Sequence, residues 1–486
     1  MGTLAVYTPG RAVVARGRAH LGGAINRSPH LALAVAVLVL LSAAVSLPAE
    51  AAVRLPVWDD RYGPTLRQDE WNDIARGPGH TVFVAGTMGF TQGTGSEMTL
   101  AKLDAAGTRV WATPTIPGVK TWPGFGASTR GHALAVDRDG NAIVAGFSSW
   151  SSGGFAVVKF SGADGHVIWW QDVQLAGFAS AEDVVVDRSG NAYVSGIALG
   201  DAGVGAAMYT VKLAATDGAT KWQNLYSSPQ LAAGSAAIAI DAKRNTYVTG
   251  YTLTLAKGTD WVTRKISAAG TSVWTRRWDG AKKDDSPDHV VVTSKGGAIY
   301  VCGLSETANA TTRDAVLVRY SASGRRVWQR RFAKANTDSI PRGMCFDSRG
   351  AVLICGERLA VDPAKTDASL LVKVTTSGKT VWLRSSTSPY NPAGNLQYAD
   401  IVRGPSGSMY VSGQVEPSNT GSSAIVERRR ADGSVAWRSV YGWPDPDENG
   451  AGSMALDGTT RLYVAGWLQT TGPNGFIDAL LMGYKP

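Results

Sequence analysis

The chain has 486 residues and a formal net charge of +9, from 48 Lys and Arg against 39 Asp and Glu. It contains 57 glycines but only three cysteines, which excludes a disulfide-stapled scaffold. The positive charge is mild for so large a surface, so it permits an anionic partner without implying one, and we expect no nucleic-acid partner. No extended stretch has apolar residues at helical spacing, which predicts an all-β protein.

The first fifty residues are typical of a targeting segment. Four arginines precede an apolar run at residues 31–47, and Ala49-Glu50-Ala51 fits the small-x-small cleavage rule. We therefore expect residues 1–51 to be a signal peptide. The alternative is a retained membrane anchor, although the run is at the short end for spanning a bilayer. Either case places the body of the chain, residues 52–486, outside the cytoplasm, secreted or anchored.

A glycine followed four residues later by a tryptophan recurs seven times, with successive tryptophans 52 to 58 residues apart. The pairs are Gly107/Trp111, Gly165/Trp169, Gly218/Trp222, Gly270/Trp274, Gly324/Trp328, Gly378/Trp382 and Gly433/Trp437. A repeat of about fifty residues built from short strands and turns is typical of a β-propeller. We interpret each tryptophan as a wedge between neighbouring blades, with the glycine before it as the turn that lets it dock.

Residues 134–170 show the pattern of one repeat. A short innermost strand at 134–137 is followed by a tight turn containing Asp139-Gly140, and then by a second strand at 142–146. A variable loop, a third strand at 155–160, a turn at Gly165 and a fourth strand around Trp169 complete the unit. The sequence therefore predicts four-stranded antiparallel blades.

The last repeat ends after its third strand, and the missing fourth strand is found near the start of the body. Residues 57–63 resemble residues 436–442, and Trp58 precedes Trp111 by one full period. We therefore predict that this N-terminal strand pairs into the sheet containing residues 453–484 and closes the ring, which also removes free sheet edges. The count is then eight blades, with seven as the alternative.

Two sets of residues recur at fixed repeat positions. In the third strand, seven of eight repeats carry a basic residue, interpreted either as a ring of cations or as solvated edge positions or partners of the hairpin aspartates: Lys102, Lys159, Lys212, Lys265, Arg319, Lys373 and Arg428. Cys302 and Cys355 occupy a slot that otherwise holds only small residues. We expect these thiols, and Cys345 on the preceding strand, to be buried and inert.

The repeat resembles the bacterial β-propeller repeat called SBBP. Its pattern of hydrophobic-x-Val-Asp-x-x-Gly-Asn-x-Tyr-Val-x-Gly, then Val-Lys-hydrophobic and Gly-x-x-x-Trp, is matched best at 184–196, 211–213 and 218–222. More distantly, the Gly-x-x-x-Trp corner is similar to that of eight-bladed quinoprotein dehydrogenases and of an envelope lipoprotein that assembles outer-membrane barrels. The resemblance implies a propeller outside the cytoplasm, and no established activity.

Candidate binding residues fall on one face of the predicted ring. The loops after the second strands are long and variable, and variation confined to one face indicates a binding surface. Three tryptophans in or beside these loops, Trp122, Trp150 and Trp467, are candidates for stacking on sugars or anchoring a protein. The alternative is local loop packing.

A second candidate set sits where the innermost strands begin, and is predicted to line the rim of the central channel: Asp73, His132, Asp183, Asp288, His289, Arg342 and Asp400. Such a circle suits a cation or polar ligand, and equally a hydrated funnel. Asp445, Asp447 and Glu448 form a weak calcium candidate because calcium prefers clustered oxygen ligands, but the full twelve-residue loop is absent. We predict no cofactor, and bound calcium is the one alternative that the sequence leaves open.

These observations favour an extracytoplasmic binding or scaffold module that recognises a protein or glycan of the cell envelope through its long-loop face, acting as a monomer. Contact with the membrane is expected only through an uncleaved N-terminal segment. The alternative is a propeller enzyme, either a polysaccharide lyase or hydrolase or a quinone-cofactor oxidoreductase. No nucleophile elbow and no His-Glu-x-x-His motif is present in the sequence.

Overall fold

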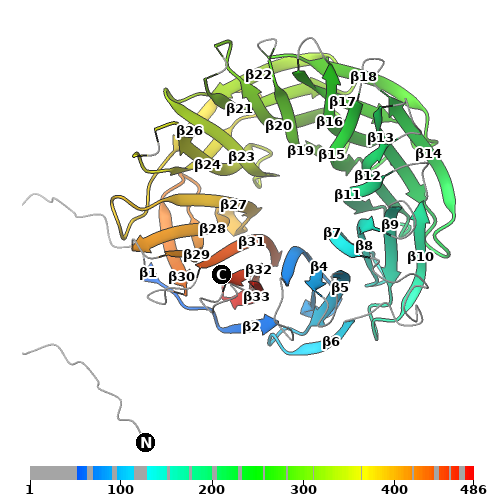
Figure 1. The fold of residues 1–486 in the computed structure, drawn as a ribbon, viewed down its shortest axis with the longest axis horizontal. Helices are drawn as coiled ribbons and strands as arrows, with labels where there is room; N and C mark the ends of the chain where they lie inside the picture. The colour runs from blue at the N-terminus through cyan, green and yellow to red at the C-terminus, as the bar shows by residue number, and fades with distance from the viewer. Residues whose placement is uncertain are drawn as a thin grey trace, which may run out of the picture. The chain divides into compact units, whose positions relative to one another are not determined.

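A computed structural model describes residues 52–62, 69–89, 96–113, 128–149, 154–173, 178–199, 205–227, 232–254, 258–280, 283–309, 311–362, 364–418, 421–442, 448–458, 461–469 and 477–485. These residues lie in one compact unit, Ala51–Pro486. In it, eight four-stranded antiparallel sheets are arranged in a ring (Figure 1). The predicted eight-bladed β-propeller is confirmed, and the seven-bladed alternative is wrong.

We number the blades 1 to 8 in chain order. Their innermost strands are β3 (Glu70–Arg76), β7 (Thr129–Val136), β11 (Ala179–Val186), β15 (Ala232–Ile240), β19 (Asp285–Val292), β23 (Thr337–Phe346), β27 (Leu396–Arg403) and β31 (Glu448–Asp457). The second strands are β4 (Val82–Gly89), β8 (Ala142–Ser148), β12 (Ala192–Leu199), β16 (Thr246–Thr254), β20 (Ala298–Glu306), β24 (Val352–Ala360), β28 (Met409–Ser418) and β32 (Arg461–Gln469).

The third strands are β5 (Ser96–Leu103), β9 (Gly154–Phe160), β13 (Ala206–Leu213), β17 (Gly258–Ile266), β21 (Arg313–Ser321), β25 (Ala368–Val374), β29 (Gly421–Arg429) and β33 (Ile477–Tyr484). The outermost strands are β6 (Arg109–Thr113), β10 (Val167–Val173), β14 (Thr220–Ser227), β18 (Ser272–Trp278), β22 (Arg326–Phe332), β26 (Thr380–Arg384), β30 (Val435–Tyr441) and, in blade 8, β2 (Trp58–Tyr62). Short 3-10 turns, η1 (Pro78–His80) and η2 (Pro405–Gly407), replace the usual hairpin in blades 1 and 7.

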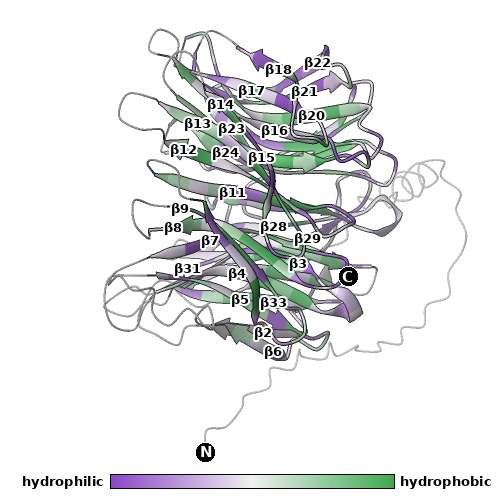
Figure 2. Ribbon diagram, turned by 90° about the vertical axis from the view of Figure 1, so that its right-hand side faces the viewer, coloured by the Kyte–Doolittle hydropathy of each residue, from purple (hydrophilic) through white to green (hydrophobic). Residues whose placement is uncertain are grey.

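The core lies between adjacent sheets. One cluster, for example, combines Ile143 and Val157 of blade 2 with Val184 and Val194 of blade 3. Figure 2 shows the corresponding apolar bands along the strands. Cys302 and Cys355 are buried and Cys345 is partly buried, all as free thiols. Burial raises the pKa of the Cys345 thiol to about 12, which suppresses the reactive thiolate. Among the described residues no helix has the length and apolar character needed to cross a membrane.

In blades 2, 3, 4 and 6 the hairpin after the innermost strand is closed by an aspartate: Asp137, Asp187, Asp241 and Asp347. Asp187 Oδ1 accepts hydrogen bonds from the backbone N–H groups of Ser189 and Asn191, at 2.9 and 3.1 Å. The carboxylate thus accepts hydrogen bonds from backbone N–H groups of the turn, as is typical of an Asx turn. Gly190 follows with a φ of +76°, a region that glycine adopts without strain.

Three of the third-strand lysines are partners of these hairpin aspartates. Lys159 Nζ lies 2.8 Å from Asp137 Oδ2, and both side chains are buried. Equivalent pairs join Lys212 to Asp187 and Lys373 to Asp347, at 3.6 and 2.8 Å. Lys159 also donates to the Ala215 carbonyl of the next blade at 2.9 Å. These three lysines therefore belong to the framework of the blades, as partners of the hairpin aspartates.

Each tryptophan of the repeat docks on the blade that follows. Trp169 Nε1 donates to the Ala215 carbonyl at 3.0 Å, and a methyl group built on Gly218 would lie 2.7 Å from the indole. The same contact joins Trp274 to Ala322 and Gly324. Each indole lies between neighbouring blades as predicted. It packs on the corner glycine of the next repeat, however, and not on the glycine of its own repeat.

The N-terminal strand closes the ring as predicted. β2 pairs antiparallel with β33, with Trp58 opposite Gly483. The indole of Trp58 occupies the space that a side chain at position 483 would need, which explains why the third-strand cation is missing there. A further strand, β1 (Ala52–Val53), pairs parallel with β30 at the outer edge of blade 7.

Candidate functional site

Every innermost strand is irregular at the same level. The pairing with the second strand shifts by one residue in all eight blades. A bulge leaves its extra residue outside the ladder and redirects the side chain. The extra residues in blades 1 to 7 are Asn72, His132, Glu182, Ala236, Asp288, Arg342 and Ala399, and in blade 8 Gly452 and Ser453 together face Ala465. Three residues predicted for the rim, His132, Asp288 and Arg342, are therefore structurally equivalent.

Three of the predicted rim aspartates hold neighbouring blades together. Asp73 Oδ1 accepts the N–H of Ile74, and its Oδ2 accepts the N–H of Leu134 in blade 2, both at 2.8 Å. Asp183 and Asp400 do the same, reaching Ile238 in blade 4 and Met454 in blade 8 at 2.8 Å. Because both carboxylate oxygens are engaged by backbone, we assign these aspartates to the framework and not to a ligand site.

Burial dominates the ionisation of these carboxyls. Desolvation raises the pKa of Asp73 to about 7, against the opposing effect of its two backbone hydrogen bonds. It raises the pKa of Asp183 to about 6 in the same way. Asp73 and Asp183 therefore gain and lose their protons at pH values where an ordinary aspartate is fully ionised.

The two predicted rim histidines also bond to the next blade. His132 Nδ1 donates to the Ala181 carbonyl at 3.0 Å, and His289 Nε2 donates to the Arg342 carbonyl at 2.9 Å. A carbonyl oxygen only accepts, so these ring nitrogens carry protons. Desolvation lowers the pKa of His289, which favours the neutral imidazole.

Arg342 and Asp288 remain available for ligand chemistry. The Arg342 guanidinium donates twice to Glu357 Oε1, with Nε at 2.9 Å, while about half of the arginine side chain stays exposed. Asp288 Oδ2 is buried and has no hydrogen-bond partner among the described residues. Desolvation raises the pKa of Asp288 to about 7, opposed by the charge of Arg342.

A cavity of about 230 Å³ opens beside Arg342, between blades 6, 7 and 8. Its polar lining comes from Arg342, Glu357, Gln397 and Gln414, and its aromatic lining from Trp467 and Tyr398. The cavity thus unites two residues predicted from sequence, Arg342 and Trp467, with three that were missed: Glu357, Gln397 and Gln414.

Three polar groups in this cavity have no hydrogen-bond partner among the residues that the structure describes. In the described part of the chain, Gln397, Gln414 and Trp467 make no hydrogen bond from their side chains. Trp467 stands opposite Gly450 in the ladder, and a methyl group there would lie 2.6 Å from Trp467 Nε1 and 3.0 Å from Gln414 Nε2. Two N–H donors therefore converge over a glycine that leaves room for both.

The back of the cavity is held by a buried ionic network. Tyr398 donates its hydroxyl proton to Glu427 Oε2 at 2.6 Å, and Glu427 is fully buried. Arg429 and Arg438 each donate to Glu427 at 2.7 Å. Nearby positive charge compensates desolvation and lowers the pKa of Glu427. A satisfied network of this kind fixes the position of Tyr398.

Two of the missed residues, Glu357 and Gln414, share one repeat position, which directly follows the glycine of the second strand. Equivalent pairing to the innermost strand places eight such residues at one level of the ring, which we call the upper ring: Thr87, Phe147, Ile197, Tyr251, Leu304, Glu357, Gln414 and Trp467. Aligning the repeats on their strand-end glycines would have found Glu357 and Gln414 next to Trp467. Gln397, opposite Gln414, follows from the same register.

The other candidates are placed as follows. Trp122, Trp150, Asp445 and Asp447 lie outside the described residues, and Glu448 is exposed at the first residue of β31. Elsewhere, Asp260, Asp279 and Asp285 bring carboxylate oxygens within 4.8 Å of one another. Desolvation raises the pKa of Asp285 to about 6, and the charges of Asp279 and Asp260 act in the same direction.

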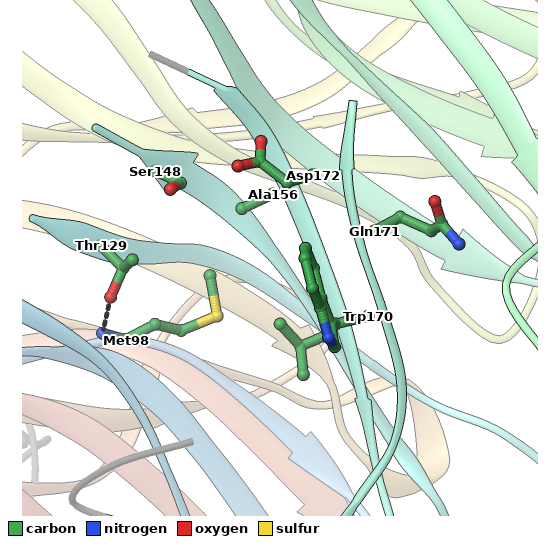
Figure 3. A pocket seen from close by; sticks show the side chains of 8 residues that line it. Met98, Thr129, Ser148, Ala156, Trp170, Gln171 and Asp172 are labelled. Carbon is green, nitrogen blue, oxygen red and sulfur yellow. Dashed lines mark hydrogen bonds between the residues drawn. The ribbon is translucent and has the colours of Figure 1, made fainter. Parts of the chain in front are cut away.

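A second, much smaller crevice lies between blades 1 and 2 (Figure 3). Met98 N–H donates to Thr129 Oγ1 there at 2.8 Å, and the indole of Trp170 lies alongside. Its volume of about 10 Å³ is no more than one water molecule needs. It is therefore a packing defect and not a ligand site.

No protein-family model matches the chain, and no curated protein matches it in sequence. Solved structures match in fold. Quinohemoprotein alcohol dehydrogenase from Comamonas testosteroni has a TM-score of 0.54 at 11% identity, over 90% of this chain and 78% of that one. Sqt1 from Chaetomium thermophilum has a TM-score of 0.52 at 10% identity, over 88% of this chain and 98% of that one. At such identities the likeness establishes the propeller fold alone.

Proposed function

We propose that this protein is an extracytoplasmic binding module that takes a saccharide in the cavity between blades 6, 7 and 8. One observation carries the proposal: three hydrogen-bonding side chains, Gln397, Gln414 and Trp467, line the same cavity of about 230 Å³ and have no hydrogen-bond partner in the described part of the chain. A polar group left without a partner in a half-buried site is costly unless water or a ligand bonds to it.

The chemistry of the cavity matches a sugar ring. The indole of Trp467 supplies an apolar face for the ring C–H groups, and the amides of Gln397 and Gln414 supply donors and acceptors for hydroxyls. The carboxylate of Glu357, held on one oxygen by Arg342, adds an acceptor. Apolar walls with a few convergent polar groups are the usual form of a small-molecule site, and the volume suits one ring.

The cellular setting is part of the same proposal. The arginine-rich leader with its apolar run supports export, with the propeller outside the cytoplasm. The recurrent Asp-x-x-Gly-Asn hairpin and the Gly-x-x-x-Trp corner support assignment to the SBBP-type repeats. A glycan of the cell envelope is then the natural source of the saccharide, and a protein partner at the same face is the competing possibility.

The proposal is tested by titrating soluble methyl glycosides and short oligosaccharides into the protein by calorimetry. Trp467→Ala and Gln414→Ala are expected to weaken binding by at least tenfold, since each removes a direct contact. Thr87→Ala, at the equivalent position of blade 1, is the matched control and is expected to bind normally. If no saccharide binds, while envelope proteins are retained by the wild type and lost with Trp467→Ala, the partner is a protein.

A second function is favoured by the ionisation of Asp288. A carboxyl with a pKa of about 7 beside an arginine is suited to general acid or base catalysis at neutral pH. This supports the enzyme alternative, a polysaccharide lyase or hydrolase. Incubation with polysaccharides, followed by size analysis, would reveal chain cleavage that disappears in Asp288→Asn. The quinone-cofactor alternative is tested separately, by a rise in Tm on adding pyrroloquinoline quinone with calcium.

A further inference from the structure

The circumference of the ring is strongly basic over three consecutive blades. The corner turn and the outermost strand lie within residues 267–278 in blade 4, 321–332 in blade 5 and 375–384 in blade 6. Together these segments hold eight Lys and Arg residues and no Asp or Glu. We call these eight cations the basic band. Their strands β18, β22 and β26 follow one another around the outside of the ring (Figure 1).

The corresponding segments of four other blades lack this charge. They hold four Lys or Arg residues against five Asp: residues 104–113, 161–173, 214–227 and 430–441. Each of these four has an aspartate in its corner turn, whereas the corner turns of blades 4 to 6 have none. The basic band is therefore a local property of blades 4 to 6 and does not simply follow from the net charge of the chain.

The cations of the band are accessible, and most have no acidic partner. Seven of the eight belong to exposed residues, and Arg276 is partly buried. Arg331 Nη1 lies 2.8 Å from Oδ2 of the buried Asp314, and no other cation of the band forms an ion pair with a described residue. Positive charge that is not neutralised locally attracts the anionic groups of a ligand.

One arginine in each of these blades is held in place by the next blade. Arg276, Arg330 and Arg384 each stand two residues after a docking tryptophan. Arg276 Nε donates to the carbonyl of Gly324 at 2.8 Å, and the other two donate likewise to a corner carbonyl of the following blade. A guanidinium has five N–H donors, and the bonds to carbonyl groups leave at least two of them on each arginine for a ligand.

Exposed valines accompany the arginines. Val273, Val327 and Val381 directly precede the three tryptophans and are 52%, 38% and 51% exposed. Each blade of the band thus offers an apolar side chain close in sequence to a fixed guanidinium. A guanidinium binds a carboxylate or sulfate through paired hydrogen bonds, and an apolar side chain suits the C–H face of a sugar ring. The two together fit a sugar that carries an acidic group.

We propose that the basic band binds a linear acidic polysaccharide along the outside of blades 4 to 6, with its acidic groups at the arginines. The band extends over three blades, which suits an extended chain because successive contacts of one polymer reinforce each other. None of the residues that line the cavity between blades 6, 7 and 8 belongs to the band. This is therefore a second binding surface, and it does not depend on the proposed saccharide site.

The test is the binding of fluorescently labelled polygalacturonate fragments of uniform length, measured by anisotropy at several salt concentrations. The affinity of the wild type is expected to fall at least about tenfold between about 50 and about 200 mM salt, because each ionic contact releases counterions. The triple variant Arg325→Gln, Arg326→Gln and Lys379→Gln removes three exposed cations of the band. It is expected to bind at least about tenfold more weakly at the lower salt concentration and to depend less on salt.

The matched control removes the same charge elsewhere. Arg138→Gln, Arg188→Gln and Lys243→Gln alter exposed residues in the inner hairpins of blades 2, 3 and 4, and this triple variant is expected to bind like the wild type. Trp467→Ala, which alters the cavity, is expected to retain the polysaccharide as well. A Tm equal to that of the wild type shows that each variant is folded.

Three results would overturn the inference. In the first, the matched control weakens binding as much as the band variant, so that affinity follows net charge alone. In the second, the band variant binds normally and Trp467→Ala does not, which places the polysaccharide in the cavity and leaves the proposed saccharide site standing. In the third, uncharged dextran or single-stranded DNA of similar length binds as tightly as polygalacturonate. Failure of methyl glycosides to bind, by contrast, removes the saccharide site and leaves the basic band untouched.

Discussion

The indole of Trp58 lies directly on Gly107, so close that a methyl group at position 107 would come within 2.1 Å of the ring. Trp58 belongs to the strand that completes blade 8, whereas Gly107 turns the chain in blade 1. The contact that joins consecutive blades elsewhere therefore also joins the two ends of the ring.

Replacing Trp58 by alanine is expected to lower the free energy of unfolding by about 3 kcal/mol, because it removes a large ring packed between two blades. Urea denaturation measures the change. Val57→Ala is the control, since Val57 is 58% exposed and its loss should be nearly neutral. Equal stability of the two variants would mean that the N-terminal strand does not close the ring.

The corner glycines are predicted to be irreplaceable for a reason beyond backbone conformation. Gly324 has a φ of +80° and its Cα faces Trp274, whereas Gly79 has a φ of +65° with open space around it. Gly79→Ala should cost about 1 kcal/mol, the penalty of a left-handed residue. Gly324→Ala should cost at least about 2 kcal/mol more, because the indole must move. Comparable Tm values for both variants would contradict the docking geometry.

Lys159→Met is expected to destabilise the protein by about 3 kcal/mol, because it leaves the buried carboxylate of Asp137 without its cation. The double variant Lys159→Met with Asp137→Asn removes the charge as well and should recover part of the loss. Chemical denaturation of both variants gives the two values. A double variant less stable than the single one would show that the hairpin bonds of Asp137, and not the ion pair, dominate.

Stability is expected to fall as the pH rises from about 4 to about 7. The folded-state pKa values of Asp73 and Asp183, about 7 and about 6, lie above the ordinary aspartate value. The folded protein therefore holds protons that the unfolded chain has released, and this contribution disappears as each buried carboxyl ionises. Asp69, Glu97, Asp285 and Asp288 act in the same direction.

The measurement is the free energy of unfolding across this pH range. Asp183→Asn should reduce the slope by as much as about 1.4 kcal/mol per pH unit, the value for one proton. It should also lower stability at pH 4, since an amide has only one oxygen for two backbone donors. A slope that the substitution leaves unchanged would show that Asp183 titrates normally.

The repeat pattern was sufficient to predict the architecture, because glycine corners, hairpin aspartates and docking tryptophans recur at fixed spacing. The closing strand was predictable for the same reason, since residues 57–63 match an outer strand elsewhere. Sequence reasoning failed where the partner of a residue lies in another repeat. Asp73 and Asp183 looked like free ligands at the channel rim, but their second backbone bond comes from the next blade.

The cavity was predicted only in part. Arg342 and Trp467 stood out as a charge at the rim and an aromatic residue beside a loop. Glu357 and Gln414 did not, because a lone polar residue at a strand end is unremarkable until three consecutive blades are aligned. Register turns these scattered residues into neighbours, and register is decided by the bulges, which the sequence does not mark.

The docking of each indole on the next blade gives the propeller a direction, since the tryptophan of every blade packs on the blade that follows it. A run of consecutive blades separated from the ring therefore has two different ends, and the surface at one end is complementary to the surface at the other. Two halves expressed separately, split in the link between β18 and β19, should accordingly reassociate in a single orientation and rebuild the toroid.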